Sequence, residues 1–123
     1  MTTRELGDEG EKIACEYLVE KGYKILDRNH RIKFGKKIFG EIDIIAKKKW
    51  RFLGKDQAVH FVEVKTISDS GERSFFPEEK VDWRKKDKLR KLCLIWLEKN
   101  NYGNNHPYQI DVIGILTNRD AKR

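Results

Sequence analysis

Two neighbouring segments have the pattern of β-strands but carry charged residues inside their apolar runs, and this combination limits the possible fold most. The segments are KIFGEIDIIAKK, residues 37–48, and AVHFVEVKTI, residues 58–67. Between them, the GKD stretch at residues 54–56 has turn chemistry. Because successive side chains of a strand point to opposite faces, each segment has one apolar face and one face with ionisable groups. A hairpin would bring the two charged faces to one side of a sheet.

Alternation assigns every residue of these segments to a face. In the first segment it places Glu41, Asp43 and Ile45 on one face, and Ile42, Ile44 and Ala46 on the other. In the second it places Phe61, Glu63 and Lys65 together. A solvated sheet face often carries Glu and Lys, so an ordinary wet face is one interpretation. The position of Asp43 argues against it, because aspartate is a poor strand former and IDIIA is otherwise apolar.

The remaining periodic segments predict one α/β domain over residues 1–123. Apolar residues recur at helical spacing over residues 5–21, which Gly22 ends, and again over residues 77–100. Residues 23–32 and 108–116 have strand character, and residues 68–79 lack periodicity, which predicts a mobile loop that contacts substrate. The order α-β-β-β-α-β indicates a mixed β-sheet flanked by helices.

The first predicted helix supplies one more carboxylate. At about 100° per residue, Glu11 lies roughly 20° from Leu18 around the helix, so it projects with the apolar stripe. The alternative is a glutamate at the edge of the stripe that reaches solvent. If Glu11 joins Asp43 and Glu63, three carboxylates lie together. Carboxylate oxygens are hard ligands suited to Mg²⁺ or Mn²⁺, and Lys65 is placed to stabilise negative charge on a phosphoryl group in transit.

Charge and composition favour a polyanionic partner. The net charge is +7, and residues 80–91 (KVDWRKKDKLRK) hold seven Lys or Arg against two Asp. A charge run is most often just a solvated helix face, but like charges one turn apart repel each other, and a phosphate backbone would relieve that repulsion. We therefore expect nucleic-acid contacts from this helix, through Arg84, Lys85, Lys88 and Lys91. Such contacts position a backbone without reading sequence.

Other sites and compartments are disfavoured by the sequence. Cys15 and Cys93 form no CxxC pattern, so we expect two buried free thiols rather than zinc ligands or a disulfide. No apolar run approaches the roughly 18 residues of a membrane span, and the polar start MTTRELGDEG is unlike a signal peptide. We expect a cytoplasmic protein with no membrane partner.

Motifs along nearly the whole chain carry a family resemblance. GxxGE at residues 7–11, EYL at 16–18, GEIDIIA at 40–46, FVEVKT at 61–66, PEEKVDWRKKDKLRKL at 77–92 and IDVIGI at 110–115 follow in order. This pattern resembles the YraN-like family of bacterial proteins, which is similar to archaeal Holliday-junction resolvases. Asp43 followed by Glu63-Val64-Lys65 resembles the PD-(D/E)xK signature of nucleases, although Ile42 stands where that signature often has proline.

The resemblance implies a restriction-endonuclease-like fold, a Mg²⁺-dependent nuclease and a catalytic set of Glu11, Asp43, Glu63 and Lys65, in which Asp43 and Glu63 bind the metal ion. DNA is favoured over RNA as the substrate, and the analogy with resolvase-like nucleases implies a homodimer. Two other functions stay open. One is a non-catalytic nucleic-acid-binding module on the same fold. The other is a protein-interaction domain with an acidic partner, which leaves an inward-facing Glu11 unexplained.

Overall fold

The computed structural model describes residues 3–49, 57–69 and 83–118. Its elements, in chain order, are α1 (Thr3–Glu20), β1 (Tyr23–Phe34), β2 (Lys37–Lys48), β3 (Val59–Asp69), α2 (Trp83–Lys99) and β4 (Tyr108–Asn118). The predicted order α-β-β-β-α-β is confirmed. The predicted turn at residues 54–56, the loop from residue 70 and the predicted helical residues 77–82 lie outside the described residues.

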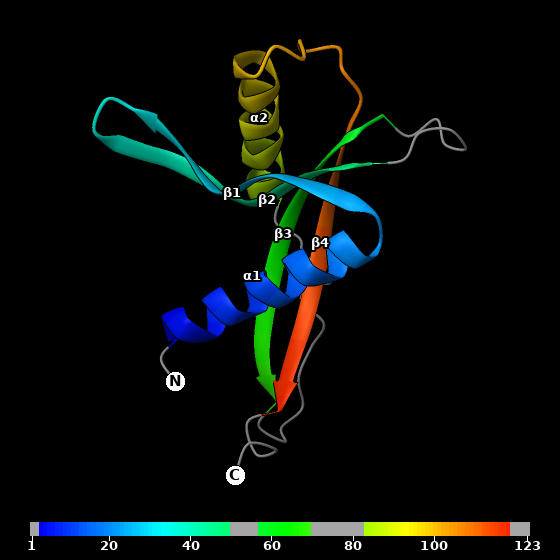
Figure 1. Ribbon diagram of the computed structural model, residues 1–123. Helices are drawn as coiled ribbons and strands as arrows, with labels where there is room; N and C mark the ends of the chain where they lie inside the picture. The colour runs from blue at the N-terminus through cyan, green and yellow to red at the C-terminus, as the bar shows by residue number, and fades with distance from the viewer. Residues whose placement is uncertain (1–2, 50–56, 70–82, 119–123) are drawn as a thin grey trace.

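The four strands form one mixed sheet in the order β1-β2-β3-β4. The first three are antiparallel neighbours, whereas β3 and β4 run parallel over the whole length of both strands, from Val59↔Tyr108 to Asp69↔Asn118. The prediction that residues 68 and 69 belong to a loop is wrong, because pairing with β4 continues to Asp69. Figure 1 shows α1 crossing one face of this sheet and α2 standing behind the other.

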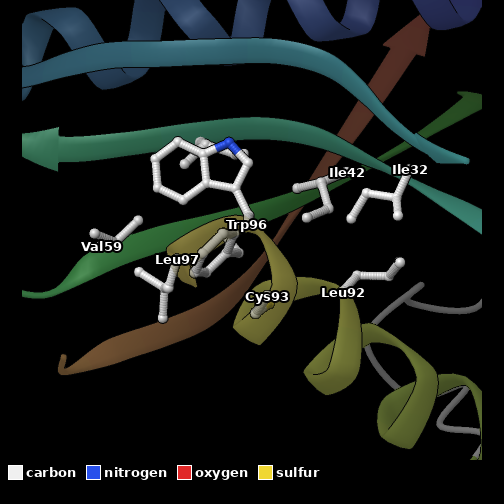
Figure 2. Packing of buried hydrophobic residues seen from close by; sticks show 9 residues of the cluster. Ile32, Ile42, Val59, Leu92, Cys93, Trp96 and Leu97 are labelled. Carbon is white, nitrogen blue, oxygen red and sulfur yellow. The ribbon is translucent and has the colours of Figure 1, made fainter. Parts of the chain in front are cut away.

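The face covered by α2 carries the larger part of the core. Leu92, Trp96 and Leu97 of α2 are buried against Ile42 and Phe61 of the sheet, as Figure 2 shows for the labelled side chains. The rings of Phe61 and Trp96 meet edge to face with their centroids 5.7 Å apart. Close packing extends along β2, because a Cβ added at Gly40 would meet the end of the Leu92 side chain.

The face covered by α1 has a smaller cluster. Ala14 and Leu18 of α1 are buried with Ile44 and Val62. Near the middle of the helix, a Cβ added at Gly10 would collide with Thr66 of β3, so the glycine allows α1 to lie directly on that strand.

The end of α1 and the two cysteines agree with the sequence predictions. α1 ends at Glu20, and Gly22 follows with φ 95°, a conformation that favours glycine.

Cys15 and Cys93 are buried free thiols, as predicted, and burial raises the pKa of Cys93 to about 12. No helix in the described part of the chain is long and apolar enough to cross a membrane.

One sequence prediction about β2 fails. Strand alternation predicts that Ile42 shares a face with Ile44 and Ala46. Ile42 and Ile45 instead pack on the sheet face covered by α2, whereas Ile44 and Ala46 pack on the face covered by α1. Side chains therefore do not alternate regularly across Asp43. The physical reason lies in the partner strand. Asn29 stands between the residues that pair with Ile44 and Ile42, and its φ of 50° is a left-handed conformation that asparagine tolerates. The β1–β2 ribbon therefore reverses its faces at the level of Asn29 and Asp43.

At the same level β2 leaves β3. The ladder between them runs from Lys47↔Val59 to Ile44↔Val62 and stops there. Beyond this point the β1–β2 hairpin swings to one side, while β3 and β4 continue together in another direction (Figure 1). We call this divergence the fork. It matters because β2 and β3 no longer pair with each other beyond this point, although each keeps its other neighbour, β1 or β4.

Candidate active site

Asp43 lies at the fork and takes the place of the missing backbone partner. Its Oδ2 accepts a hydrogen bond of 2.8 Å from the backbone N–H of Val64, two residues past Val62, the last residue of β3 that pairs with β2. Burial is the main cause that raises the pKa of Asp43, and the charges of Glu63 and Glu41 add to it. The hydrogen bond from Val64 and the charge of Lys65 act in the opposite direction. Asp43 thus interacts electrostatically with three charged neighbours at the fork, Glu41, Glu63 and Lys65.

Glu63 and Lys65 follow on β3, on the edge that β2 has left. Nζ of Lys65 lies 3.3 Å from Oε2 of Glu63, and both side chains are 41% exposed. This contact confirms the prediction that the two side chains lie on the same face of the strand. The charge of Glu63 raises the pKa of Asp43, and the charge of Lys65 lowers it. The structure therefore brings Asp43, Glu63 and Lys65 together at the fork.

Glu11 approaches the same region from α1. Its Oε1 is buried and has no hydrogen-bond partner within the described residues, which agrees with the inward orientation predicted from the helical angle. Burial is the largest cause that raises the pKa of Glu11, and the negative charge of Asp43 is the next. The Asn29 side chain opposes both. Glu11 therefore interacts electrostatically with Asp43. It approaches the fork from the face of the sheet that α1 covers, which is opposite the face covered by α2.

Glu41 lies close to Asp43 and Glu11, but the sequence did not predict it as a site residue. Its charge raises the pKa values of both Asp43 and Glu11, so it lies near each of them. Oε1 of Glu41 also stands 3.6 Å from Nε of Arg31. The signal in the sequence is its position two residues before Asp43. That signal was weak, because Glu41 also fits an ordinary exposed strand position.

Two pockets open beside the fork on the α2 face. The first is lined by Glu41, Asp43 and Glu63 together with Ile42, Phe61, Val62 and Leu89. The second contains Glu41 and Glu63 again, now with Lys85 and Lys88 of α2. The N-terminal half of α2 thus places two positive side chains next to the carboxylates.

The four predicted nucleic-acid contacts are not equivalent. Lys85 and Lys88 line the second pocket, and Nζ of Lys88 lies 5.2 Å from the ring centre of Phe39 on the hairpin. Lys91 instead pairs with Asp87 of its own helix, with Nζ 3.5 Å from Oδ2. Arg84 is exposed and lines neither pocket. Of the predicted four, Lys85 and Lys88 are therefore the two that line a pocket beside the carboxylates.

The donor set at the fork fits a hard divalent cation with few protein ligands. In the part of the chain that the structure describes, no three His, Cys, Asp or Glu side chains are grouped closely enough to hold a metal ion. Mg²⁺, however, usually takes only one or two carboxylates and keeps several waters. Asp43 with Glu63 meets that requirement, and the raised pKa of Asp43 beside two other carboxylates marks a place where a cation would relieve repulsion.

Comparison with known proteins gives a family for this chain. The model of the family described as "Uncharacterised protein family UPF0102" matches residues 10–115. A UPF0102 protein of Clostridioides difficile is 41% identical over 115 residues, which cover 94% of this chain and 88% of the relative. A UPF0102 protein of Thermodesulfovibrio yellowstonii is 40% identical over 116 residues, with 94% and 88% covered. Five of the six motifs that carry the YraN-like resemblance lie wholly within the matched residues 10–115, and the sixth, GxxGE at residues 7–11, ends within them. The chain belongs to the UPF0102 family.

Proposed function

We propose that this chain is a Mg²⁺- or Mn²⁺-dependent endonuclease that hydrolyses phosphodiester bonds in DNA, including branched or junction DNA. The observation that carries the proposal is the position of Asp43 at the fork. There its carboxylate accepts a hydrogen bond from the backbone N–H of Val64 and interacts electrostatically with both Glu63 and Lys65. Two carboxylates beside an ammonium group suit phosphodiester hydrolysis, which needs a cation site and a positive group near the attacking water.

Asp43 and Glu63 are the residues that would hold the metal ion. When bound, Mg²⁺ or Mn²⁺ would polarise a phosphoryl oxygen and make a water molecule more acidic. The hydrogen bond from Val64 holds the Asp43 carboxylate in one orientation before any ligand arrives. Such preorganisation matters because a site held in place needs no rearrangement during the reaction.

Lys65 would act on the attacking water and on the negative charge of the transition state. Its ion pair with Glu63 is exposed, and exposed pairs contribute at most about 1 kcal/mol. Lys65 can therefore exchange this partner for substrate at little cost. Glu11 would complete the site with a buried carboxylate oxygen that has no hydrogen-bond partner within the described residues.

Lys85 and Lys88 would bind the DNA backbone next to the carboxylates, since both line the pocket that contains Glu63. Contacts of lysine with phosphates give affinity that depends on salt and carry no sequence information. We therefore expect recognition of nucleic-acid shape rather than of sequence. A homodimer and a preference for DNA over RNA are further parts of the proposal, and they rest on the resemblance to junction resolvases.

The experiment is a nuclease screen over duplex, flap, junction and single-stranded DNA, with matching RNA, in Mg²⁺, Mn²⁺ or EDTA. Wild type should cut in a metal-dependent way. Glu63→Gln and Lys65→Ala should each lose at least about 100-fold in rate, the scale seen when one charge-stabilising group is removed. Glu98→Gln, an exposed change at the end of α2, is the matched control and should keep full activity. Unchanged cutting by both site variants would refute the assignment.

One observation favours a second candidate, a nucleic-acid-binding module without catalysis. Within the described residues no group of three metal-ligating side chains occurs. Calorimetric titration with Mg²⁺ or Ca²⁺ separates the two candidates. Heat of binding that disappears in Glu63→Gln supports the nuclease, whereas no metal binding together with salt-sensitive DNA binding supports the module.

A further inference from the structure

A groove on the α1 face of the sheet is distinct from the fork, and none of Glu11, Asp43, Glu63 and Lys65 lines it. Its volume is ≈ 520 Å³, within the range of roughly 300–1,000 Å³ that is usual for small-ligand sites. Its polar and aromatic lining comes from α1, β1, β2, β4 and the turn after α1, and consists of Tyr17, Lys21, Tyr23, Lys48, Gln109 and Asp111. Tyr17 and Asp111 belong to the EYL and IDVIGI motifs, which the proposed endonuclease site does not use.

The rim of the groove combines flat rings with positive charge. Nζ of Lys21 lies 5.5 Å from the ring centre of Tyr17, and Nζ of Lys48 lies 5.8 Å from that of Tyr23. Tyr17 is 50% exposed, an unusual position for a large aromatic side chain on a helix with a buried face. A tyrosine ring of this kind can stack on a planar ligand, and the lysines can turn toward an anion.

The floor of the groove holds a carboxylate in a fixed orientation. Oδ1 of Asp111 accepts a hydrogen bond of 2.7 Å from Nε2 of Gln109, and Oδ2 lies 2.9 Å from Nδ1 of His60. His60 is only 3% exposed, and the Tyr23 ring packs edge-on against it with the centroids 5.1 Å apart. Asp111 itself keeps 32% of its side chain exposed, and each carboxylate oxygen can accept more than one hydrogen bond. The groove thus contains a hydrogen-bond acceptor, the Asp111 carboxylate, that is already held in one orientation.

We propose that this groove binds a nucleotide whose base carries an exocyclic amino group, such as cytosine. The base would stack on Tyr17, its amino group would donate to Asp111, and its phosphate would contact Lys21 and Lys48. Cytosine is the base whose amino group an aspartate typically accepts from, whereas thymine and uracil present a carbonyl oxygen at that position. A nucleotide joins a flat ring, a donor and an anion in one ligand, which matches the three kinds of group in the groove.

The nucleotide can be free or part of a single strand, and the test distinguishes these sources. ¹⁵N-labelled full chain is titrated in EDTA with cytidine monophosphate, uridine monophosphate, (dC)₅ and (dT)₅. The backbone amides of Tyr17, Lys48 and Asp111 should shift, and cytosine ligands should bind about tenfold more tightly than uracil or thymine ligands. Equal affinity for cytidine monophosphate and (dC)₅ would assign a free nucleotide, and binding of (dC)₅ alone would assign a strand.

Variants separate recognition from a structural role of these residues. Tyr17→Ala should weaken every ligand about tenfold, whereas Asp111→Asn should remove the preference for cytosine while leaving weak binding. Val19→Ala is the matched control, because Val19 of α1 is 53% exposed, close to the value for Tyr17, but does not line the groove.

Three results would overturn the proposal. One is the absence of shifts at the groove amides at millimolar ligand. Another is equal loss of affinity in Tyr17→Ala and Val19→Ala. The third is an unchanged base preference in Asp111→Asn, provided that its amide spectrum is that of a folded chain. None of these results depends on metal binding or on cleavage at the fork, so failure here leaves the proposed endonuclease untouched.

Discussion

The two halves of β3 differ in their neighbours, and the difference explains where the candidate site can exist. Residues 59–62 pair with β2 on one edge and with β4 on the other, and all four are buried. From Glu63 onward the strand keeps only β4 in its ladder, and the described side chains there are half-buried. Ionised groups are costly in the first half and tolerated in the second. A strand can thus belong to the core at one end and form a partly exposed edge at the other.

The largest expected effect comes from the first half. Phe61→Ala should lower the free energy of unfolding by about 3–5 kcal/mol, because it removes a ring packed against Trp96 and Tyr108. Urea denaturation followed by circular dichroism measures the loss. Leu116→Ala is the control, since Leu116 is 60% exposed on β4 and should change stability little. Equal losses in the two variants would contradict the contrast between buried and open positions.

A smaller effect tests how α1 lies on the second half. Gly10→Ala should destabilise the chain by about 1–3 kcal/mol, because the added methyl group meets Thr66. Gly7→Ala, three residues earlier in the same helix, meets nothing within 4 Å and should instead stabilise by up to about 1 kcal/mol. In a double-mutant cycle with Thr66→Ala, part of the Gly10→Ala loss should be recovered. No recovery would mean that α1 does not rest on Thr66.

Asp43→Asn tests the charge at the fork through its pH dependence. The pKa of Asp43 is raised above its ordinary value of 3.8, chiefly by burial, so the folded chain holds this proton more tightly than the unfolded chain. The ionised carboxylate therefore lowers stability above the raised pKa, and this penalty disappears as the pH falls below 3.8. Asparagine keeps an acceptor for the N–H of Val64 without the charge. Asp43→Asn should be more stable than wild type at pH 8, and the difference should vanish near pH 3.

Urea midpoints across this pH range measure the effect. Glu98→Gln controls for the loss of any negative charge from a chain with net charge +7, and it should not reproduce the pattern. A wild type that is more stable than Asp43→Asn at pH 8 would indicate that favourable contacts of the carboxylate outweigh its burial.

The smallest effect is expected two residues after Phe61. Glu63→Gln should change the free energy of unfolding by no more than about 0.5 kcal/mol, because its side chain is 41% exposed and its ion pair with Lys65 is solvated. The same urea experiment as for Phe61→Ala measures it. A loss above about 1 kcal/mol would place Glu63 in the structural core and would remove the distinction between the two halves of β3.

Periodicity was sufficient to predict the element order, because each helix and strand has a face that must be buried. The same rule failed within β2. Strict alternation paired Ile42 with Ile44, but the left-handed Asn29 on the neighbouring strand reverses the faces at Asp43. No pattern within residues 37–48 encodes that reversal, since its cause lies in β1. The extension of β3 to Asp69 also depends on a distant partner, β4.

The candidate site could be predicted in part for the same reason. The inward direction of Glu11 follows from local helical geometry, and the contact of Glu63 with Lys65 follows from strand alternation. The hydrogen bond from Val64 to Asp43, the nearness of Glu41 and the pairing of Lys91 with Asp87 depend on tertiary placement or on competition between neighbours. The roles of these residues in catalysis stay a prediction that the nuclease screen addresses.

The parallel pairing of β3 with β4 also sets the order in which the molecule can assemble. Each residue of β3 pairs with one 49 positions later, whereas β1 and β2 form a hairpin joined by a turn at Gly35 and Lys36. Contacts between distant segments form slowly, because the intervening chain must be ordered before they are gained. On the ribosome, β4 emerges after β1, β2 and β3. Until it docks, β3 has an unpaired edge along its whole length, so a strand that is synthesised after the other three described strands completes the scaffold of the fork.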